Sequence, residues 1–365
     1  MNKHLIQQLL LTAICQLMTV VCLIISSCSS DDAPALPKIR LLSHIEIPGN
    51  LGTDVWGYTD QSTGQEYAIM GDFSNLRNGN VTLVDITEPT DPQITATSTE
   101  VIGFDMKTFE HYLYVTNSDF PSAEDDSSRI LDISDPANPQ IVGAFQPAHN
   151  IFIQGTYLYV SFEFAPGLRI FDLAPDPTEP QMVWESNSPN GGHDVAVIGN
   201  RLYDFHAREA TYIYDIQDPD NPQLLGEIRN QNTYHHSGWV TEDDRYLFIC
   251  DETAADPLPD ITIWDISDPA NPAMIGDISD NTARAHNLYI IENLAYVSYY
   301  GAGFKIFDVS TPSNPLLLDQ YETNLNQGTG IGNGFLGAFG VYPFSSSGII
   351  LVSDMDNGLF VFEFK

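Results

Sequence analysis

The chain has 365 residues and carries 49 acidic against 14 basic side chains, a formal net charge of −35 at pH 7. Such a charge repels nucleic acid and anionic lipid surfaces, and it concentrates cations, including divalent metals. The length suits either two ordinary domains or one large array of β-strands.

Residues 1–27 have the composition of an export signal. Lys3 precedes a long apolar stretch that ends in Ile25-Ser26-Ser27-Cys28, and small residues before a cysteine are what lipoprotein cleavage and acylation need. We expect Cys28 to become the acylated first residue of the mature chain, anchored in outer-membrane lipid. The alternative is an uncleaved membrane helix. Cleavage removes Lys3 and no acid, which leaves 13 bases and 49 acids, a net charge of 13 − 49 = −36.

Residues 28–36 are predicted to form a flexible tether. The segment Cys28-Ser29-Ser30-Asp31-Asp32 resembles the serine- and aspartate-rich signal that directs lipoproteins to the outer face of the outer membrane. The sequence therefore predicts a surface-exposed lipoprotein of the cell envelope. Of the four cysteines, only Cys250 stays free and unacylated in such a mature chain, so no intramolecular disulfide is expected.

One short motif recurs six times after residue 80. Each copy has a strand of alternating apolar residues, a turn that begins at an aspartate, and a second strand after a proline, as in RILDISDPANPQIVG and ITIWDISDPANPAMIG. An aspartate in a turn accepts nearby backbone N–H groups, and proline stops the ladder, so both are predicted to be structural. The marker aspartates are Asp85, Asp132, Asp172, Asp215, Asp265 and Asp308, spaced by 47, 40, 43, 50 and 43 residues.

Two further short strands precede each marker, and four strands in about 40 to 45 residues make a propeller blade. The end of the chain supplies only three strands, and residues 37–42 resemble the missing fourth. Pairing the N-terminal strand with the last three closes the ring. The sequence thus predicts an all-β, seven-bladed β-propeller over residues 37–365, functioning as a monomer.

The repeats also resemble a known family. The segments VDITEP, LDISDPANP and WDISDPANP look like LVIVD repeats, and the layout from DVWGY (54–58) through HSGW (236–239) to GVYPF (340–344) is similar to the choice-of-anchor B family. The resemblance covers about residues 40–365. It implies a repeat domain displayed on the cell exterior and no established reaction.

The residues that open the innermost strands are predicted to converge around the central channel, where propellers usually bind ligands. They are Asp54, Asp105, His149, His193, His236 and His286, with Phe339-Gly340 in the seventh blade. Imidazoles and carboxylates are ligands for zinc, manganese or iron, and oxygen-rich loops suit calcium, so a divalent metal is the predicted cofactor. The alternative is that each histidine ties neighbouring blades together by bonding to backbone.

Loops on the same face are expected to add further ligands. These secondary candidates are Asp72, Asp119, Glu163, His206, Asp251, Glu252, Tyr299, Tyr300 and Asp354. Trp56 and Trp239, with the two tyrosines, are candidates for a carbohydrate or peptide surface.

The sequence favours a binding module over an enzyme. It contains no nucleophile elbow, phosphate loop, paired C-x-x-C or H-E-x-x-H motif, and we assign no catalytic residue. The predicted ligand is a protein, peptide or glycan bound at the histidine-bearing face. The alternative is a metal-dependent hydrolase or lyase that uses the same ring of histidines and acids.

Overall fold

A computed structural model describes residues 38–47, 51–75, 78–99, 101–117, 127–230, 233–254, 257–280, 282–323 and 335–365. The signal and tether segments predicted at 1–27 and 28–36, Cys28 and Asp119 lie outside these residues. The chain divides into two units between Pro37 and Lys38, and the account below concerns the unit Lys38–Lys365. Within the described part of the chain, no helix has the length and apolarity needed to cross a membrane.

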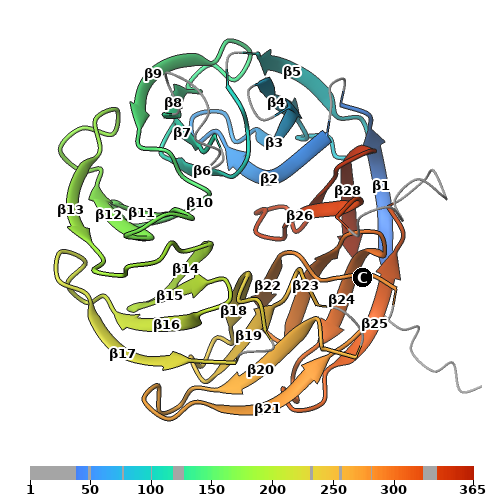
Figure 1. The fold of residues 1–365 in the computed structure, drawn as a ribbon. Coiled ribbons are helices and arrows are strands. Elements are labelled where there is room, and N and C mark those ends of the chain that lie inside the picture. Colours follow the sequence, from blue (N-terminus) through green and yellow to red (C-terminus); the bar gives the residue numbers. More distant parts are fainter. Residues whose placement is uncertain are drawn as a thin grey trace, which may run out of the picture. The chain divides into compact units, whose positions relative to one another are not determined.

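The described residues form seven antiparallel sheets of four strands each, arranged around a central axis (Figure 1). Six sheets are consecutive in sequence, and their strands run in order from the axis outward, as in β2-β3-β4-β5. The seventh has the order β1-β28-β27-β26. The predicted seven-bladed propeller is therefore confirmed.

The strand bounds show the repeat directly. The first three blades contain β2 (Leu51–Thr59), β3 (Glu66–Asn75), β4 (Asn78–Asp85), β5 (Gln93–Ser98); β6 (Met106–Phe109), β7 (Tyr112–Val115), β8 (Ser128–Asp132), β9 (Gln140–Phe145); and β10 (Asn150–Gln154), β11 (Tyr157–Ser161), β12 (Leu168–Asp172), β13 (Gln181–Glu185). The next three contain β14 (Asp194–Ile198), β15 (Arg201–His206), β16 (Ala210–Asp215), β17 (Gln223–Ile228); β18 (Ser237–Val240), β19 (Tyr246–Cys250), β20 (Ile261–Asp265), β21 (Ala273–Ile278); and β22 (Leu288–Ile291), β23 (Leu294–Tyr299), β24 (Gly303–Asp308), β25 (Leu316–Tyr321). The closing blade contains β1 (Ile39–Ile45), β26 (Ala338–Tyr342), β27 (Ile350–Asp354) and β28 (Gly358–Phe364).

The N-terminal strand closes the ring as predicted. Strand β1 pairs antiparallel with β28, from Ile39 opposite Phe364 to Ile45 opposite Leu359, and Lys38 donates its backbone N–H to the carbonyl of Lys365 at 2.6 Å. The pairing gives the last blade its outer strand and covers what would be an exposed edge.

The marker aspartates have the predicted turn role. In all six copies the carboxylate accepts the backbone N–H two residues further on, at 2.8 to 3.0 Å, as Asp132 does from Ser134. Each carboxylate thereby replaces a backbone acceptor in the turn that leads to the outermost strand. These aspartates are structural.

An apolar cluster fills each of the seven interfaces between neighbouring blades. Alternation along the strands places one set of apolar side chains against the preceding blade and the other against the following blade. Cys250 is fully buried in the cluster between the β18–β21 and β22–β25 blades, and burial raises the pKa of its thiol, so it behaves as a small hydrophobic residue.

Candidate functional site

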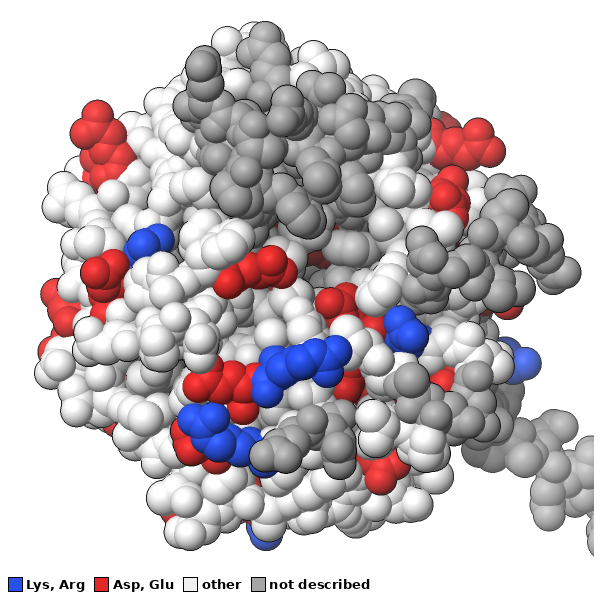
Figure 2. All heavy atoms as spheres, in the orientation of Figure 1, with Lys and Arg blue, Asp and Glu red and all other residues white. Residues whose placement is uncertain are grey.

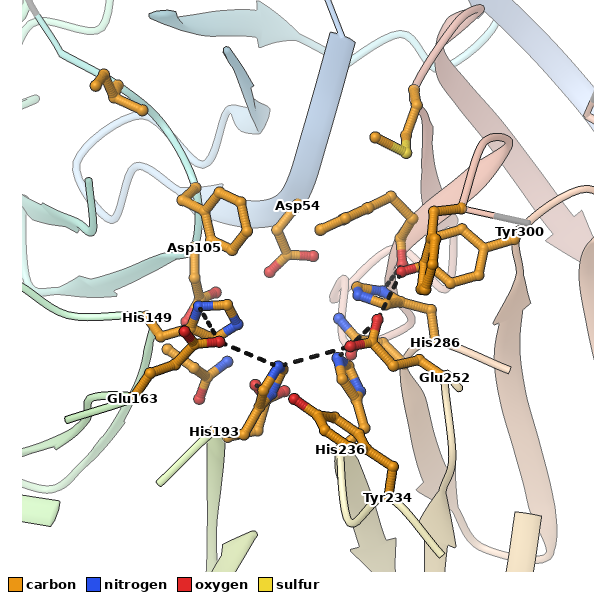
Figure 3. Close-up of a pocket in the computed structure, with 18 residues that line it drawn as sticks. Asp54, Asp105, His149, Glu163, His193, Tyr234, His236, Glu252, His286 and Tyr300 are labelled. Atoms are coloured by element: carbon orange, nitrogen blue, oxygen red, sulfur yellow. Dashed lines mark hydrogen bonds and ion pairs between the residues drawn. The ribbon is translucent and has the colours of Figure 1, made fainter. Parts of the chain in front are cut away.

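A cavity of about 340 Å³ opens around the central axis, and all six predicted ring residues line it. Figure 3 shows their side chains converging from separate blades, with the imidazoles of His149, His193, His236 and His286 following one another in an arc. Each ring lies just before the innermost strand of its blade, so the blade repeat itself sets the spacing. Successive ring centroids are 4.2, 4.5 and 4.6 Å apart.

Two glutamates from loops between second and third strands contact this arc. The Glu163 carboxylate lies 3.9 Å from both His149 Nδ1 and His193 Nε2. The Glu252 carboxylate lies 3.7 Å from His193 Nε2 and 3.6 Å from His236 Nε2. The phenol of Tyr300 donates to Glu252 Oε2 at 3.0 Å. Nitrogen and oxygen donors therefore alternate along the arc.

Neighbouring groups orient two of the imidazoles. Nδ1 of His286 donates to the carbonyl of Phe339 at 2.7 Å, which leaves Nε2 without a proton in the neutral ring. Nδ1 of His193 is 3.0 Å from the Asp194 carboxylate, and its Nε2 faces Glu163 and Glu252. A carboxylate or carbonyl on one ring nitrogen is the usual way that proteins orient a metal-binding histidine.

Burial keeps most of the arc neutral. Burial lowers the pKa of His286 to about 3, although the Phe339 carbonyl opposes this shift. Burial, reinforced by the neighbouring imidazoles, also lowers the pKa values of His149 and His236 well below the usual range. Neutral imidazoles have the lone pair that a metal requires.

His193 behaves differently from its neighbours. Burial disfavours its protonation, but the hydrogen bond to Asp194 and the negative charges of Asp194, Glu252 and Glu163 outweigh burial and raise the pKa. Burial raises the pKa values of Asp194 and Glu252, against the effect of His193. The arc therefore has one imidazole that its carboxylates favour in the protonated form, between neighbours that stay neutral.

The two predicted aspartates contact a buried lysine, and Asp105 lies beside His149 in the cavity (Figure 3). Asp105 Oδ1 is 2.5 Å from the Lys107 ammonium, and Asp54 Oδ2 is 3.7 Å from it. Burial raises the pKa of Asp54 well above its usual range; Lys107 lowers it, and the hydrogen-bonded Asp105 carboxyl raises it further. Asp105 Oδ2 also accepts the backbone N–H of Ile151 in the next blade at 2.7 Å. Asp105 is thus engaged in holding two blades together.

The secondary candidates separate into two groups. Glu163, Glu252 and Tyr300 line the cavity. Among the described residues, the others lie elsewhere: Asp72 beside Asn80, His206 beside Asp204, Asp251 under the backbone N–H groups of Tyr234 and Thr253, Tyr299 in the core between two blades, and Asp354 under the N–H groups of Asp356 and Asn357.

Several cavity residues were not predicted as ligands from the sequence. Asn150, Asp194 and Asn287 each follow a ring histidine directly and line the cavity. The repeated pair of histidine plus a small polar residue, at 149–150, 193–194, 236–237 and 286–287, was the signal available. Further cavity-lining residues are Ile102, Phe104, Tyr234, Phe335 and Met355, together with Phe339, which the sequence placed at the seventh-blade position.

Aromatic side chains fill the axis on the inner side of the cavity. A smaller space of about 30 Å³ shares Asn150, Asp194 and Asn287 with the cavity, and Phe152, Trp239 and Tyr289 line its far side. The Trp239 ring packs against Phe152, Tyr289 and Phe344, and the Phe344 ring packs in turn against Trp56 and Tyr342. Trp56 and Trp239, predicted near the mouth, belong to this aromatic cluster. The aromatic cluster thus fills the axis on the side of the cavity away from Glu163 and Glu252.

Charged groups of both signs gather near the centre of one face of the propeller (Figure 2). Two arginines stand beside aromatic residues of the cavity: Arg208 lies 5.4 Å from the Tyr234 ring and Arg284 lies 5.2 Å from the Phe335 ring. The cavity thus combines an acidic and imidazole-rich interior with guanidinium groups against its aromatic wall.

Comparisons with known proteins agree with the repeats and the fold. The family profile for the LVIVD repeat matches residues 105–146, 147–187, 241–280 and 283–323, so the chain carries LVIVD repeats. No curated protein matches the sequence significantly. Among solved structures, the WD40 β-propeller domain of Doa1 is similar at a TM-score of 0.60 and 11% identity, covering 89% of this chain and 96% of that one. The computationally designed protein Ika8 is similar at a TM-score of 0.55 and 10% identity, covering 89% and 99%. These likenesses show the fold alone.

Proposed function

We propose that this LVIVD-repeat propeller is a binding module whose ligand site contains a divalent transition metal in the central cavity. The observation that carries the proposal is the arc of four imidazoles with two carboxylates between them. Three of the four rings are held neutral by burial, as metal ligands must be.

The donor types select the kind of metal. Imidazole nitrogen together with carboxylate oxygen suits zinc, manganese or iron, whereas calcium prefers oxygen ligands alone. The negative field of the chain, at −35, raises the local concentration of such cations. We therefore place Zn²⁺, Mn²⁺ or Fe²⁺ in the arc.

The rest of the cavity indicates the chemistry of the ligand. Its volume of about 340 Å³ is in the range of small-molecule sites and is suited to one end of a peptide or glycan chain. Phe104, Phe339 and Met355 provide an apolar wall, and Arg208 and Arg284 stand near its rim. A ligand with an oxygen anion for the metal and an apolar segment for the wall fits both features.

The location of the module is also part of the proposal. The repeats, the DVWGY and GVYPF segments and the Ser-Ser-Cys sequence at 26–28 support membership of the choice-of-anchor B family, with Cys28 as a lipid anchor in the outer membrane. Metabolic labelling with a palmitate analogue should mark the wild-type chain and not the Cys28→Ala variant. Equal labelling of both chains would refute the proposal that Cys28 carries a lipid anchor.

A metal-dependent hydrolase or lyase is the second candidate. The observation that favours it is the trio His236, Glu252 and His286, since two histidines and a glutamate leave a fourth position open on a catalytic zinc. The binding module predicts stable, metal-dependent retention of an unchanged peptide or glycan. The enzyme predicts conversion of the ligand, visible by mass spectrometry after incubation with the metal-loaded protein.

Metal titration of the full-length, chelator-treated protein tests the main proposal. We expect calorimetry to show binding of Zn²⁺ or Mn²⁺. Loss of a residue that only orients a metal ligand weakens metal binding ten- to hundredfold, so loss of a ligand itself, in His236→Ala, should weaken it by more than that. The matched control is His111→Ala, since His111 lies in the hairpin turn between β6 and β7 and is not among the residues that line the cavity. Failure of the wild-type protein to bind either ion, or unchanged affinity in His236→Ala, would overturn the proposal.

A further inference from the structure

We propose, building on the metal function above, that the arc binds two divalent cations side by side. One ion would be held by His149, Glu163 and His193, and the other by His236, Glu252 and His286. The two trios share no residue and have the same composition, two imidazoles and one glutamate.

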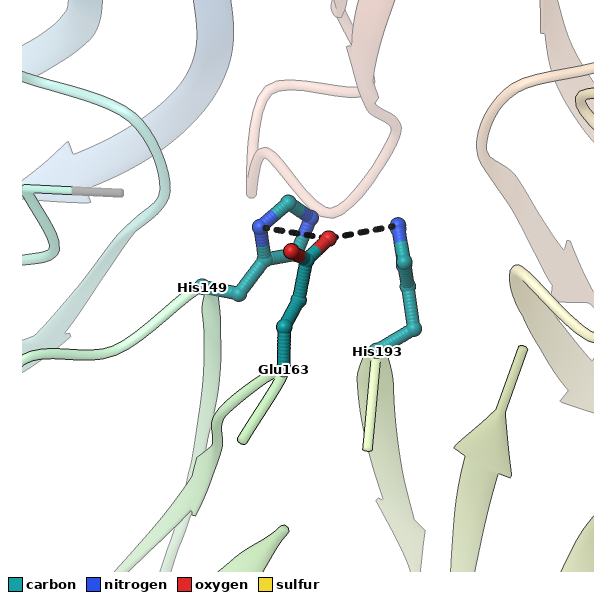
Figure 4. A group of neighbouring side chains, drawn as sticks. All are labelled: His149, Glu163 and His193. Atoms are coloured by element: carbon teal, nitrogen blue, oxygen red, sulfur yellow. Dashed lines mark ion pairs between the residues drawn. The ribbon is translucent and has the colours of Figure 1, made fainter. Parts of the chain in front are cut away.

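The first trio is shown in Figure 4, with the Glu163 carboxylate between the two imidazoles. Its Oε1 atom is equidistant from His149 Nδ1 and His193 Nε2, at 3.9 Å. Bonds of about 2.1 Å to a tetrahedral ion place neighbouring ligand atoms about 3.4 Å apart. The two oxygen–nitrogen distances are therefore longer than in a loaded site by about half an ångström, and Glu163 has room to move because its side chain is 41% exposed.

The second trio is more rigid. Glu252 Oε2 lies 3.6 Å from His236 Nε2, and Tyr300 holds the same oxygen at 3.0 Å. His286 is oriented by its bond to the Phe339 carbonyl. Partners fixed in this way favour tighter binding at the second trio than at the first.

One ion cannot serve the whole arc. Among the described residues, the groups of donors that lie within 4.8 Å of one another include His149 with His193, but never His149 with His236 or His286. Ligands of a single tetrahedral ion must all lie within about 3.4 Å of each other. No described group of three or more close donors therefore spans both ends of the arc, and each trio matches an ion of its own.

The middle of the arc offers a competing single site. His193, Asp194 and His236 also form a group within 4.8 Å. Asp194, however, is already 3.0 Å from Nδ1 of His193, the nitrogen that points away from the two glutamates. Asp194 is therefore a positioning residue for His193. The division between the two proposed ion sites falls between the His193 and His236 rings.

The charge of the cavity suits two cations. Five carboxylates line it, from Asp54, Asp105, Asp194, Glu163 and Glu252, and a single buried ammonium, that of Lys107, offsets them nearby. Bound cations favour the ionised form of these carboxyls. With all five ionised, one divalent ion leaves a net charge of −5 + 1 + 2 = −2, whereas two ions bring it to −5 + 1 + 4 = 0, and an oxygen anion of a ligand can bridge the two ions. The same bridging position is where the anionic end of the proposed ligand would bind.

Metal stoichiometry of the full-length protein tests this inference. Native mass spectrometry after Zn²⁺ loading should give two ions for the wild type, one for Glu163→Gln, one for Glu252→Gln, and none for the double variant. Glu185→Gln, an exposed glutamate on β13, is the matched control and should keep two. With Mn²⁺, electron paramagnetic resonance should show exchange-coupled ions in the wild type and isolated ions in each single variant.

The outcomes separate the two proposals. A wild type without bound metal overturns the proposed function. A wild type that binds one ion overturns the two-ion inference and leaves the metal function standing. The same holds if Glu163→Gln and Glu252→Gln each abolish all metal binding. Should a variant fail to fold, judged by circular dichroism, the wild-type stoichiometry and the Mn²⁺ spectrum alone decide.

Discussion

Replacement of Asp105 tests whether this predicted ring residue holds blades together or binds the ligand. Asp105 is 4% exposed and accepts the Ile151 N–H at 2.7 Å, the Met106 N–H at 2.8 Å and the Lys107 ammonium at 2.5 Å. Asp105→Ala leaves a buried ammonium whose nearest remaining carboxylate, that of Asp54, is 3.7 Å away. Removing one partner of a buried pair costs about 3 to 5 kcal/mol, and we expect a loss of that size.

Urea denaturation followed by circular dichroism measures this loss. Asp105→Asn keeps one acceptor oxygen but no charge, so it should cost less, about 1 to 3 kcal/mol. The double variant Asp105→Asn with Lys107→Met removes both charges and should recover part of the loss. Metal stoichiometry should stay at the wild-type value in every variant that folds. A loss below about 1 kcal/mol in Asp105→Ala, or a loss of bound metal without a loss of stability, would refute the structural assignment.

Two further predictions concern acid stability and blade packing. Burial lowers the pKa values of four imidazoles, those of His149, His235, His236 and His286. Between pH 6.5 and 5 these rings are protonated in the unfolded chain and neutral in the folded chain. The metal-free protein should therefore lose up to about 1.4 kcal/mol of folding free energy per pH unit for each of them. The raised pKa of His193 acts in the opposite sense above pH 6.5. Buried carboxyls also oppose the loss, because burial raises the pKa of Asp260 to about 7 and the folded chain then binds a proton that the unfolded chain does not. The imidazole contribution is therefore isolated by His286→Gln, which should lose less stability than the wild type from pH 6.5 to 5, and equal losses in urea titrations would contradict this reasoning. Gly226→Ala should lower the stability by about 1 to 3 kcal/mol, because its Cβ would lie 1.7 Å from the Pro269 carbonyl oxygen. Gly276→Ala should lower it less, because the atom nearest to its Cβ would be 3.2 Å away. Equal losses in thermal melts would count against close blade packing.

The sequence predicts the closed ring of blades well because every blade repeats the same turn residues at the same places. The aspartate turns and the prolines fix where the third strand ends and the fourth begins, and the incomplete last copy indicates the pairing of β1 with β28. The same periodicity places Asp54, Asp105 and the four histidines at equivalent positions, and these six residues line one cavity. Residues fixed by the repeat are therefore the ones that can be placed without coordinates.

The loop candidates could not be sorted in this way, because neighbouring side chains point in opposite directions. Asp251 turns back to accept the Tyr234 and Thr253 N–H groups, and Glu252, one residue later, faces the cavity. Tyr299 packs in the core, while Tyr300, with a φ of 23°, reaches Glu252. A positive φ in a bulky residue is costly and is not encoded in any local pattern.

The four histidines occupy the same place in the repeat, yet their hydrogen bonds differ. If the repeat used its histidines to join neighbouring blades, each histidine would make the same hydrogen bond to the next blade. Residues next to the histidines make bonds of this kind instead: Asn150 accepts the Val195 N–H, and Ser237 donates to the His286 carbonyl.

His286 bonds in the manner of a tie, through the Phe339 carbonyl, whereas His193 pairs with Asp194. Because the adjacent polar residues already join the blades, imidazoles at His193 and His236 are not needed for that purpose. Burying them together, at a cost in acid stability, is the arrangement that the proposed metal site requires.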